Sequence, residues 1–109
     1  MTHNDVVLHR GHSIIQHGHS NNRVYVMKLA QEDIPDVIRF ADTITEKEGY
    51  SKIFIKVPES SADVFSHDGY ITEATVPFFY RGKEPAVFMA KYPDPKRKEI
   101  HNMVNSISL

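Results

Sequence analysis

A helical pattern between two strand-like segments constrains the fold of this chain more than any other feature. Residues 33–48 place apolar side chains at helical spacing on one face, namely Ile34, Val37, Ile38, Ala41 and Ile44. The flanking segments 23–29 and 51–57 are rich in β-branched and aromatic residues, which favour strands. A strand, a helix and a second strand in this order predict parallel strands joined by a crossover helix.

The ends of this helix carry clear signals. We expect Asp33 to cap the N-terminus, and Pro35 falls in the first turn, where its missing N–H costs little. Gly49 stands where a helix C-cap needs a left-handed conformation. The sequence therefore predicts both helix boundaries.

The segment 51–57 is apolar on both of its faces. Ile53, Ile55 and Val57 would share one side of a strand, while Phe54 would point to the other. This pattern predicts a central strand with cover on each side of the sheet.

Two hairpins are predicted around these elements. Segments 13–17 and 23–29 are separated by turn-forming residues, and so are segments 71–79 and 86–92. Hairpins pair antiparallel strands, whereas the crossover helix joins parallel ones. The sequence therefore predicts an α/β protein with a mixed sheet.

A short helix over residues 60–68, capped by Ser60 or Ser61, completes the expected order β-β-α-β-α-β-β. We expect residues 1–12 to be a flexible lead-in and residues 13–92 to form the domain. Residues 93–109 would be a C-terminal helix or a linker to a following domain.

Composition excludes several classes of function. A chain of 109 residues suits one domain, and 13 basic against 14 acidic residues leave no excess of positive charge for binding nucleic acid. Without cysteine, the chain has neither disulfides nor thiolate nucleophiles. No apolar run reaches the ~18 residues that span a membrane, and no signal peptide pattern begins the chain. We therefore expect a cytoplasmic protein with neither nucleic-acid nor membrane partners.

The order and spacing of motifs in residues 48–92 resemble the later half of the GNAT acetyltransferase fold. The likeness rests on a helix ending in Glu48-Gly49-Tyr50, the strand 53–58, the pair Gly69-Tyr70, the run Phe78-Phe79-Tyr80 and a closing strand 86–92 with a Met-x-Lys pattern. The resemblance implies a GNAT-like half-fold in an acyltransferase that uses acetyl-CoA.

Three further segments resemble the N-terminal part of β-lysine acetyltransferases, namely 14–18, 22–29 and 49–54. The resemblance implies that this chain is the N-terminal domain of a two-part enzyme whose acetyl-CoA-binding GNAT domain follows it. The expected partner is that C-terminal catalytic domain of the same polypeptide, or a second copy of the chain in a homodimer.

The acetyl-CoA cradle of the GNAT family is missing from the matching place. The family uses Arg/Gln-x-x-Gly-x-Gly/Ala between a strand and the next helix, where backbone N–H groups bind the pyrophosphate. Residues 29–36 contain no glycine here, and Glu32, Asp33 and Asp36 would repel phosphate. At Phe65, where the family often has a tyrosine that protonates coenzyme A, we expect a core aromatic. We therefore assign no catalytic or cofactor-binding residue, and acetyl-CoA is implied only for the full enzyme.

An aromatic cluster is the candidate interface or substrate-side surface. It comprises Phe78, Phe79, Tyr80 and Tyr92. Strand alternation would place Phe78 and Phe79 on opposite faces, so that one of them is exposed, although packing in the core is the commoner role of such residues.

Two other groupings carry less chemistry. His17 and His19, with His9 or His12, could approach a metal ion, but we expect solvated turn histidines and assign no metal ligand. Serine, histidine and aspartate within residues 60–68 are neighbours in sequence, which does not make a catalytic triad.

Three functions remain open from the sequence. The favoured one is a domain of an N-acetyltransferase that acts on an amine such as β-lysine and is inactive as the isolated chain. The alternative is a non-catalytic GNAT-like module for dimerisation or protein binding. A small-ligand sensor built on the histidine-rich first hairpin is the third.

Overall fold

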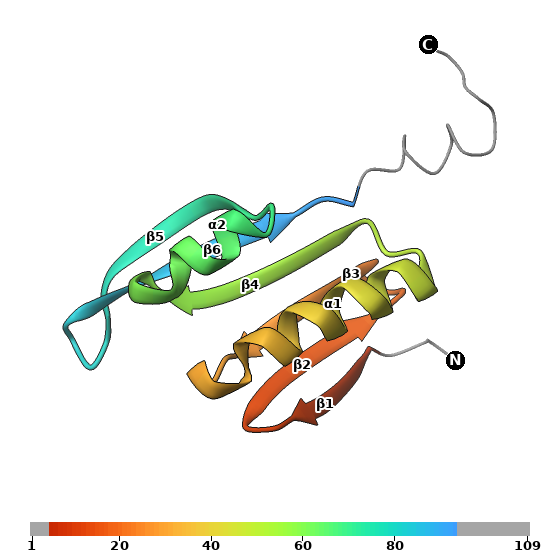
Figure 1. The fold of residues 1–109 in the computed structure, drawn as a ribbon, viewed down its shortest axis with the longest axis horizontal. Helices are drawn as coiled ribbons and strands as arrows, with labels where there is room; N and C mark the ends of the chain where they lie inside the picture. Colours follow the sequence, from red (N-terminus) through yellow and green to blue (C-terminus); the bar gives the residue numbers. More distant parts are fainter. Residues whose placement is uncertain (1–4, 94–109) are drawn as a thin grey trace, which may run out of the picture.

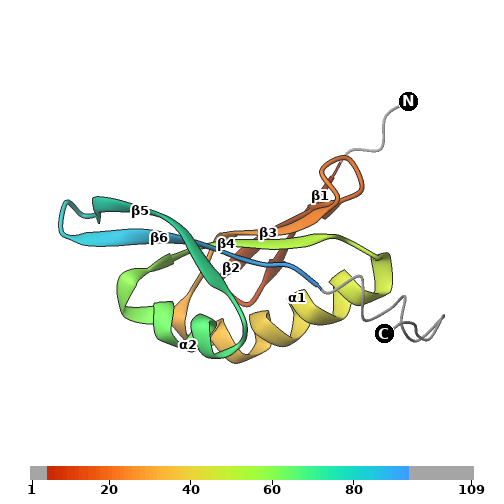
Figure 2. The ribbon, with the colours of Figure 1, turned by 90° about the horizontal axis from the view of Figure 1, so that it is seen from above.

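The computed structural model describes residues 5–93 and shows a mixed sheet with both helices on one side (Figures 1 and 2). The strands are β1 (Val6–Arg10), β2 (Ser13–Gly18), β3 (Arg23–Lys28), β4 (Lys52–Pro58), β5 (Ile71–Tyr80) and β6 (Glu84–Lys91). The α-helices are α1 (Ile34–Glu48) and α2 (Ala62–His67), each preceded by a 3-10 turn, η1 (Gln31–Asp33) and η2 (Glu59–Ser61). This is the mixed α/β fold that the sequence predicts.

The strand order in the sheet is β1-β2-β3-β4-β6-β5. Strands β3 and β4 are parallel, as expected for a pair joined by the crossover helix α1. The other neighbouring strands are antiparallel. The parallel ladder aligns Arg23–Val26 with Lys52–Ile55 and stops there, although β3 continues to Lys28 and β4 to Pro58.

Strand β1 corrects the prediction for the start of the chain. Residues 1–12 were expected to be a flexible lead-in, but Val6–Arg10 pair with β2, which adds a strand to the predicted order. Gly11, with a φ of 62°, turns the chain between the two strands. The apolar run Val6-Val7-Leu8 was the strand signal, and the surrounding polar residues obscured it. The expected C-terminal helix or linker lies almost wholly outside the described residues.

Helix α1 confirms both predicted boundaries, but the expected capping bond at its N-terminus is absent. Gly49 is left-handed at φ 76°, and its N–H bonds the Thr45 carbonyl oxygen at 2.9 Å. Asp33 lies at the N-cap position, but its carboxylate does not bond the helix. The predicted serine caps of α2 are likewise absent, because neither Ser60 nor Ser61 makes a side-chain capping bond.

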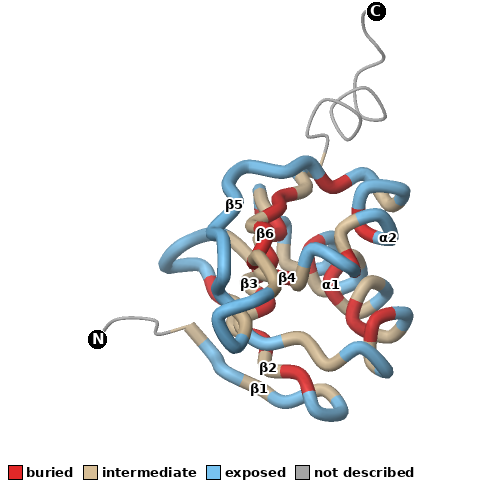
Figure 3. The backbone as a smooth tube through the Cα atoms, turned by 90° about the vertical axis from the view of Figure 1, so that its left-hand side faces the viewer, coloured by how far each residue is buried: buried red, intermediate tan, exposed pale blue. Residues whose placement is uncertain are grey.

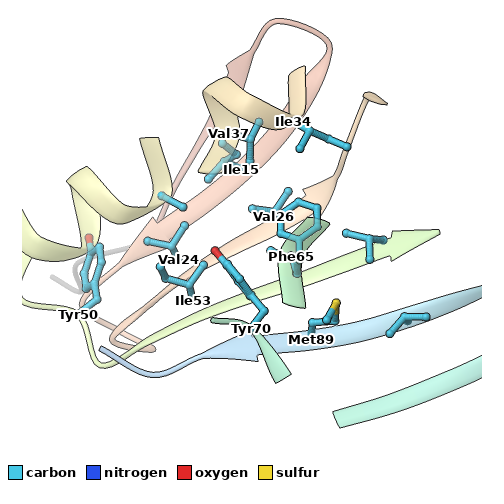
Figure 4. Packing of buried hydrophobic residues seen from close by; sticks show 14 residues of the cluster. Ile15, Val24, Val26, Ile34, Val37, Tyr50, Ile53, Phe65, Tyr70 and Met89 are labelled. Atoms are coloured by element: carbon cyan, nitrogen blue, oxygen red, sulfur yellow. The ribbon is translucent and has the colours of Figure 1, made fainter. Parts of the chain in front are cut away.

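The hydrophobic core lies between the sheet and the helix layer (Figure 3). It includes Ile15, Val24, Val26, Val37, Ile53, Ile55, Val57, Phe65, Tyr70 and Met89, most of which Figure 4 labels. Phe65 is fully buried and meets the Tyr70 ring edge-on at 5.3 Å between centroids. The prediction of a core aromatic at Phe65 is confirmed.

Within residues 5–93, helices cover only one of the two faces of β4 that were predicted to be covered. Ile53, Ile55 and Val57 face the helices and are buried. Phe54 points to the opposite side, where no helix of the described chain lies (Figure 2). Among the described residues, no helix is both long and apolar enough to cross a membrane.

Phe65→Ala should lower the free energy of unfolding by about 3–5 kcal/mol, because it leaves a cavity beneath α2. Phe78→Ala is the matched control: its side chain is 71% exposed, and its removal should change stability by less than about 0.5 kcal/mol. Urea titrations followed by circular dichroism compare the two. Equal effects would contradict this account of the core.

Candidate functional site

The junction between β3 and α1 is the place where the GNAT resemblance implies a pyrophosphate cradle. Here the chain leaves β3 at Lys28, passes through η1 and enters α1 at Ile34. A helix N-terminus presents unpaired N–H groups and a partial positive charge, so that it attracts anions. In this chain, the acidic side chains at the junction make contacts with the turn between β1 and β2.

Asp33 holds that turn through a small hydrogen-bond network. Its Oδ2 accepts from the His12 backbone N–H at 2.7 Å and from the Ser13 hydroxyl at 2.9 Å. The same hydroxyl, on a fully buried Ser13, accepts from the Ala30 N–H at 2.9 Å. One carboxylate therefore joins the β1–β2 hairpin to the start of α1.

Gly11 allows this close approach. A Cβ built on Gly11 would lie 2.3 Å from Asp33 Oδ1, so that a larger residue would displace the carboxylate. The left-handed backbone at Gly11 also disfavours any L side chain.

A second carboxylate of the junction pairs with β1. Asp36 accepts from Arg10 Nε at 2.7 Å and from Arg10 Nη2 at 3.1 Å. The hydrogen bond from Arg10 lowers the pKa of Asp36, and the same bond raises the pKa of Arg10. The guanidinium also lies 4.4 Å from the Phe40 ring centroid, which fixes it against α1.

The ends of β3 and β4 diverge, and side chains from the two 3-10 turns meet across the opening. Beyond Val26 and Ile55 the two strands no longer pair. Gln31 Nε2, following β3, donates to Ser61 Oγ, following β4, at 3.3 Å. The junction is therefore connected to both halves of the sheet.

Tyr70 is a buried polar residue whose position the sequence did not single out as a site. The residue is only 3% exposed, and its hydroxyl has no hydrogen-bond partner within the described residues. Burial, followed by the charges of Asp42 and Asp68, raises the pKa of Tyr70 above its ordinary range. In the sequence, Tyr70 belongs only to the Gly69-Tyr70 motif of the GNAT resemblance.

Lys91 lies above Tyr70 and joins the two helices to β6. Its Nζ is 2.9 Å from Asp42 Oδ1 and 3.1 Å from Asp68 Oδ2. Burial opposes the charge on Lys91, but the two hydrogen bonds outweigh it and raise the pKa of this amine. The ammonium is also 5.5 Å from the Tyr70 ring centroid, which gives the ring a cation–π contact.

The histidines of the first hairpin contact α1 and the residues after it. His17 Nδ1 is 2.8 Å from the Tyr50 hydroxyl, and His19 Nε2 is 3.1 Å from Glu48 Oε1. Burial, followed by the charges of Glu48 and Asp5, raises the pKa of Tyr50. Within residues 5–93, the structure brings together no group of three or more residues able to hold a metal ion.

The serine, histidine and aspartate residues within 60–68 make separate contacts. His67 Nδ1 is 2.9 Å from the Asp63 carbonyl oxygen, whereas Asp68 binds Lys91. The Ser60 N–H donates to Glu84 Oε2 at 2.8 Å. The structure therefore arranges these residues as structural contacts and not as a nucleophile with its base.

The aromatic cluster is spread along the end of the β5–β6 hairpin and the exit of β6. Phe78, Phe79 and Tyr92 are exposed, and Tyr80 is half-buried. Phe78 has a φ of 55°, which interrupts the extended backbone. Strand alternation predicted one exposed phenylalanine, but the register breaks between Val76 and Tyr80, and both rings are exposed.

Asp33→Ala should lower the free energy of unfolding by about 1–3 kcal/mol, because the His12 N–H and the Ser13 hydroxyl lose their acceptor. Glu46→Ala, exposed on α1, is the control and should stay within about 0.5 kcal/mol of wild type. Chemical denaturation measures both. An Asp33 variant as stable as the control would show that this hydrogen-bond network does not stabilise the fold.

Comparison with known proteins finds one relative by sequence and several acetyltransferases by structure. No family profile matches the chain. Over 86 residues, 79% of the chain, it is 35% identical to a protein named β-lysine N6-acetyltransferase from Methanococcus maripaludis. The chain spans 31% of the length of that relative.

Solved acetyltransferase structures share the architecture at low sequence identity. The ribosomal-protein-S18-alanine N-acetyltransferase from Escherichia coli aligns with a TM-score of 0.62 and 13% identity, covering 84% of this chain and 71% of that one. A GNAT family acetyltransferase from Elizabethkingia anophelis, with acetyl-CoA bound, aligns at 0.55 and 11% identity, covering 74% and 67%. Nourseothricin acetyltransferase aligns at 0.55 and 15% identity, covering 73% and 55%. The chain therefore has a GNAT-like fold and resembles the GNAT acetyltransferase superfamily.

Proposed function

We propose that this chain is the N-terminal GNAT-like domain of an N-acetyltransferase that transfers acetyl from acetyl-CoA to an amine such as β-lysine. The observation that carries the proposal is the 35% identity, across 79% of this chain, to a protein named for that reaction. Because the chain spans 31% of that relative, the other parts of the enzyme would lie outside it.

The acetyl-CoA site would belong to another domain. A diphosphate needs free N–H groups and positive potential at the β3–α1 junction. Here Asp33 and Glu32 end the 3-10 turn before α1, and Asp36 follows in its first turn. These residues do not fit a diphosphate, which supports placing the cofactor on a following GNAT domain.

This domain would then shape the amine side of the enzyme or stabilise the pair of domains. Phe78, Phe79, Tyr80 and Tyr92 are the proposed interface or substrate-side residues. Their support is exposure: Phe78 is 71% and Tyr92 is 51% exposed, which is unusual for large apolar side chains without a partner. The cytoplasm is the compartment we propose, in keeping with the absence of cysteine.

A non-catalytic GNAT-like module for dimerisation or protein binding is the second candidate. The observation that favours it is the helix-free side of the sheet, on which Phe54 and its aromatic neighbours are half-buried and no helix of the described chain covers them. Such a module would use the same surface without taking part in acetyl transfer.

Titration of the purified chain with acetyl-CoA in a calorimeter should give no heat of binding, because the acidic junction repels the pyrophosphate. An acetyltransferase with an intact cradle serves as the positive control. Binding in the micromolar range would contradict the proposal that the cofactor site lies elsewhere.

A chimera tests the catalytic proposal. In it, this chain replaces the aligned 86-residue segment of the methanococcal relative. We expect the chimera to acetylate β-lysine, whereas the relative without that segment should not, because the remaining part loses its partner domain. Acetylation is measured by mass spectrometry. A folded chimera no more active than the deletion would argue for the non-catalytic module.

A further inference from the structure

The side of the sheet opposite the helices carries a continuous aromatic row. We call this side the helix-free face and define it by Tyr25, Phe54, Phe88, Val76, Phe79 and Tyr92. The Tyr25 and Phe54 ring centroids are 5.4 Å apart, and those of Phe54 and Phe88 are 5.7 Å apart. These three rings come from β3, β4 and β6, which are neighbours in the sheet. The row therefore crosses the centre of the molecule.

The rim of this face towards β5 is strongly exposed. Every residue from Ile71 to Phe79 is exposed, as Figure 3 shows for β5. Val76, opposite Ala86 in the register, is 39% exposed, and Phe79 is 45% exposed. Apolar surface of this extent on a sheet is normally covered by another layer.

Positive charges accompany the rings. The Arg23 guanidinium is 5.2 Å from the Tyr25 centroid, and Lys52 Nζ is 4.8 Å from the Phe54 centroid. Lys56 Nζ is 4.9 Å from the Phe79 centroid. Each of the three cations therefore lies against an aromatic ring of this face.

These cations have little compensating negative charge. Lys52 is 3.5 Å from Glu73, but in the part of the chain that the structure describes neither Arg23 nor Lys56 pairs with a carboxylate. Glu73 also accepts from the Tyr92 hydroxyl, so this carboxylate is shared between Lys52 and Tyr92. The chain as a whole has a net charge of -1, so Arg23 and Lys56 are local positive charges and not part of a general basic excess.

We propose that the helix-free face docks an apolar, acid-bordered surface of a second protein domain. This inference rests on the proposed function, in which that domain is the acetyl-CoA-binding part of the same enzyme. The rings would supply the buried centre, and carboxylates of the partner would pair with Arg23 and Lys56.

Charge and ring geometry separate this partner from two others. A second copy placed face to face would bring the unpaired Arg23 and Lys56 of both copies into one interface with few carboxylates to neutralise them. A single-stranded nucleic acid needs free ring faces for stacking, but Phe54 and Phe88 stack on each other at an interplanar angle of 20°. An acidic protein surface satisfies both constraints.

The end of the β5–β6 hairpin would extend this interface. The hairpin projects past the helix layer in Figure 2 and carries Phe78 in a left-handed conformation, with φ 55°. A non-glycine residue in that conformation is strained, and strain of this kind gathers at binding sites. Contact with a partner would turn the exposed Phe78 ring into buried surface.

The test uses the methanococcal relative without its aligned segment as the probe, and the intact chain as the ligand. Binding is measured by calorimetry for wild type, for Arg23→Glu with Lys56→Glu, and for Arg39→Glu with Lys47→Glu. The last pair is exposed on α1 and changes the charge by the same amount. Melting temperatures confirm that the probe and each variant are folded.

We expect the pair on the helix-free face to weaken binding by about tenfold or more, and the α1 pair to change it by less than about twofold. Equal effects of the two pairs, or no binding by wild type, would overturn the proposal. So would a homodimer of the chain that only the Arg23 and Lys56 changes dissociate, or binding of a single-stranded oligonucleotide that these changes abolish.

The outcomes for the two proposals are separable. An active chimera that tolerates Arg23→Glu with Lys56→Glu as well as it tolerates the α1 pair would overturn this docking surface and leave the proposed function standing. An inactive chimera, together with binding that the Arg23 and Lys56 changes weaken, would overturn the proposed function and leave the docking surface standing.

Discussion

The parallel ladder between β3 and β4 joins the two halves of this molecule. On one side of it lies the antiparallel meander β1-β2-β3, and on the other lie β4, β6 and β5. In the described chain the ladder aligns only Arg23–Val26 with Lys52–Ile55. Because so short a ladder is weak alone, the halves depend on α1 and on the core residues beneath it, Val24, Val26, Ile53 and Ile55.

The junction after β3 shows how a GNAT-like scaffold can be stable with acidic residues in place of a glycine-rich loop. Asp33 accepts from the His12 N–H and the Ser13 hydroxyl, and Asp36 pairs with Arg10. Both carboxylates bind the first hairpin to α1. The same carboxylates carry the proposal that a diphosphate binds elsewhere, so the stability of the junction and the proposed function rest on one set of residues.

The two sides of the sheet have different chemistry. The helix side contains the buried core and its ion pairs, among them Lys91 with Asp42 and Asp68. The helix-free face contains the rings of Tyr25, Phe54 and Phe88 with cations beside them. This asymmetry is the physical basis for proposing a partner on the second side, in an acetyltransferase or in a binding module.

The sequence by itself determined the features that depend on local spacing. Helical periodicity placed α1, Gly49 marked its left-handed end, and the aromatic at Phe65 was identified as core. The mixed sheet followed from the alternation of strands and helices, and the GNAT resemblance from the order of motifs. These succeeded because each signal lies within a few residues of the structure it predicts.

Only the tertiary structure decided the features that depend on distant contacts. Asp33 had the pattern of a helix cap, but its partners lie 20 and 21 residues away in the first hairpin. Strand β1 exists because β2 offers an edge to pair with, and both Phe78 and Phe79 are exposed where the register of β5 breaks between Val76 and Tyr80. Period-two alternation in β4 predicted two covered faces, but periodicity cannot say which chain supplies a cover. The fold places both helices on one side, and that placement leaves Phe54 and its neighbours without a covering helix in the described chain.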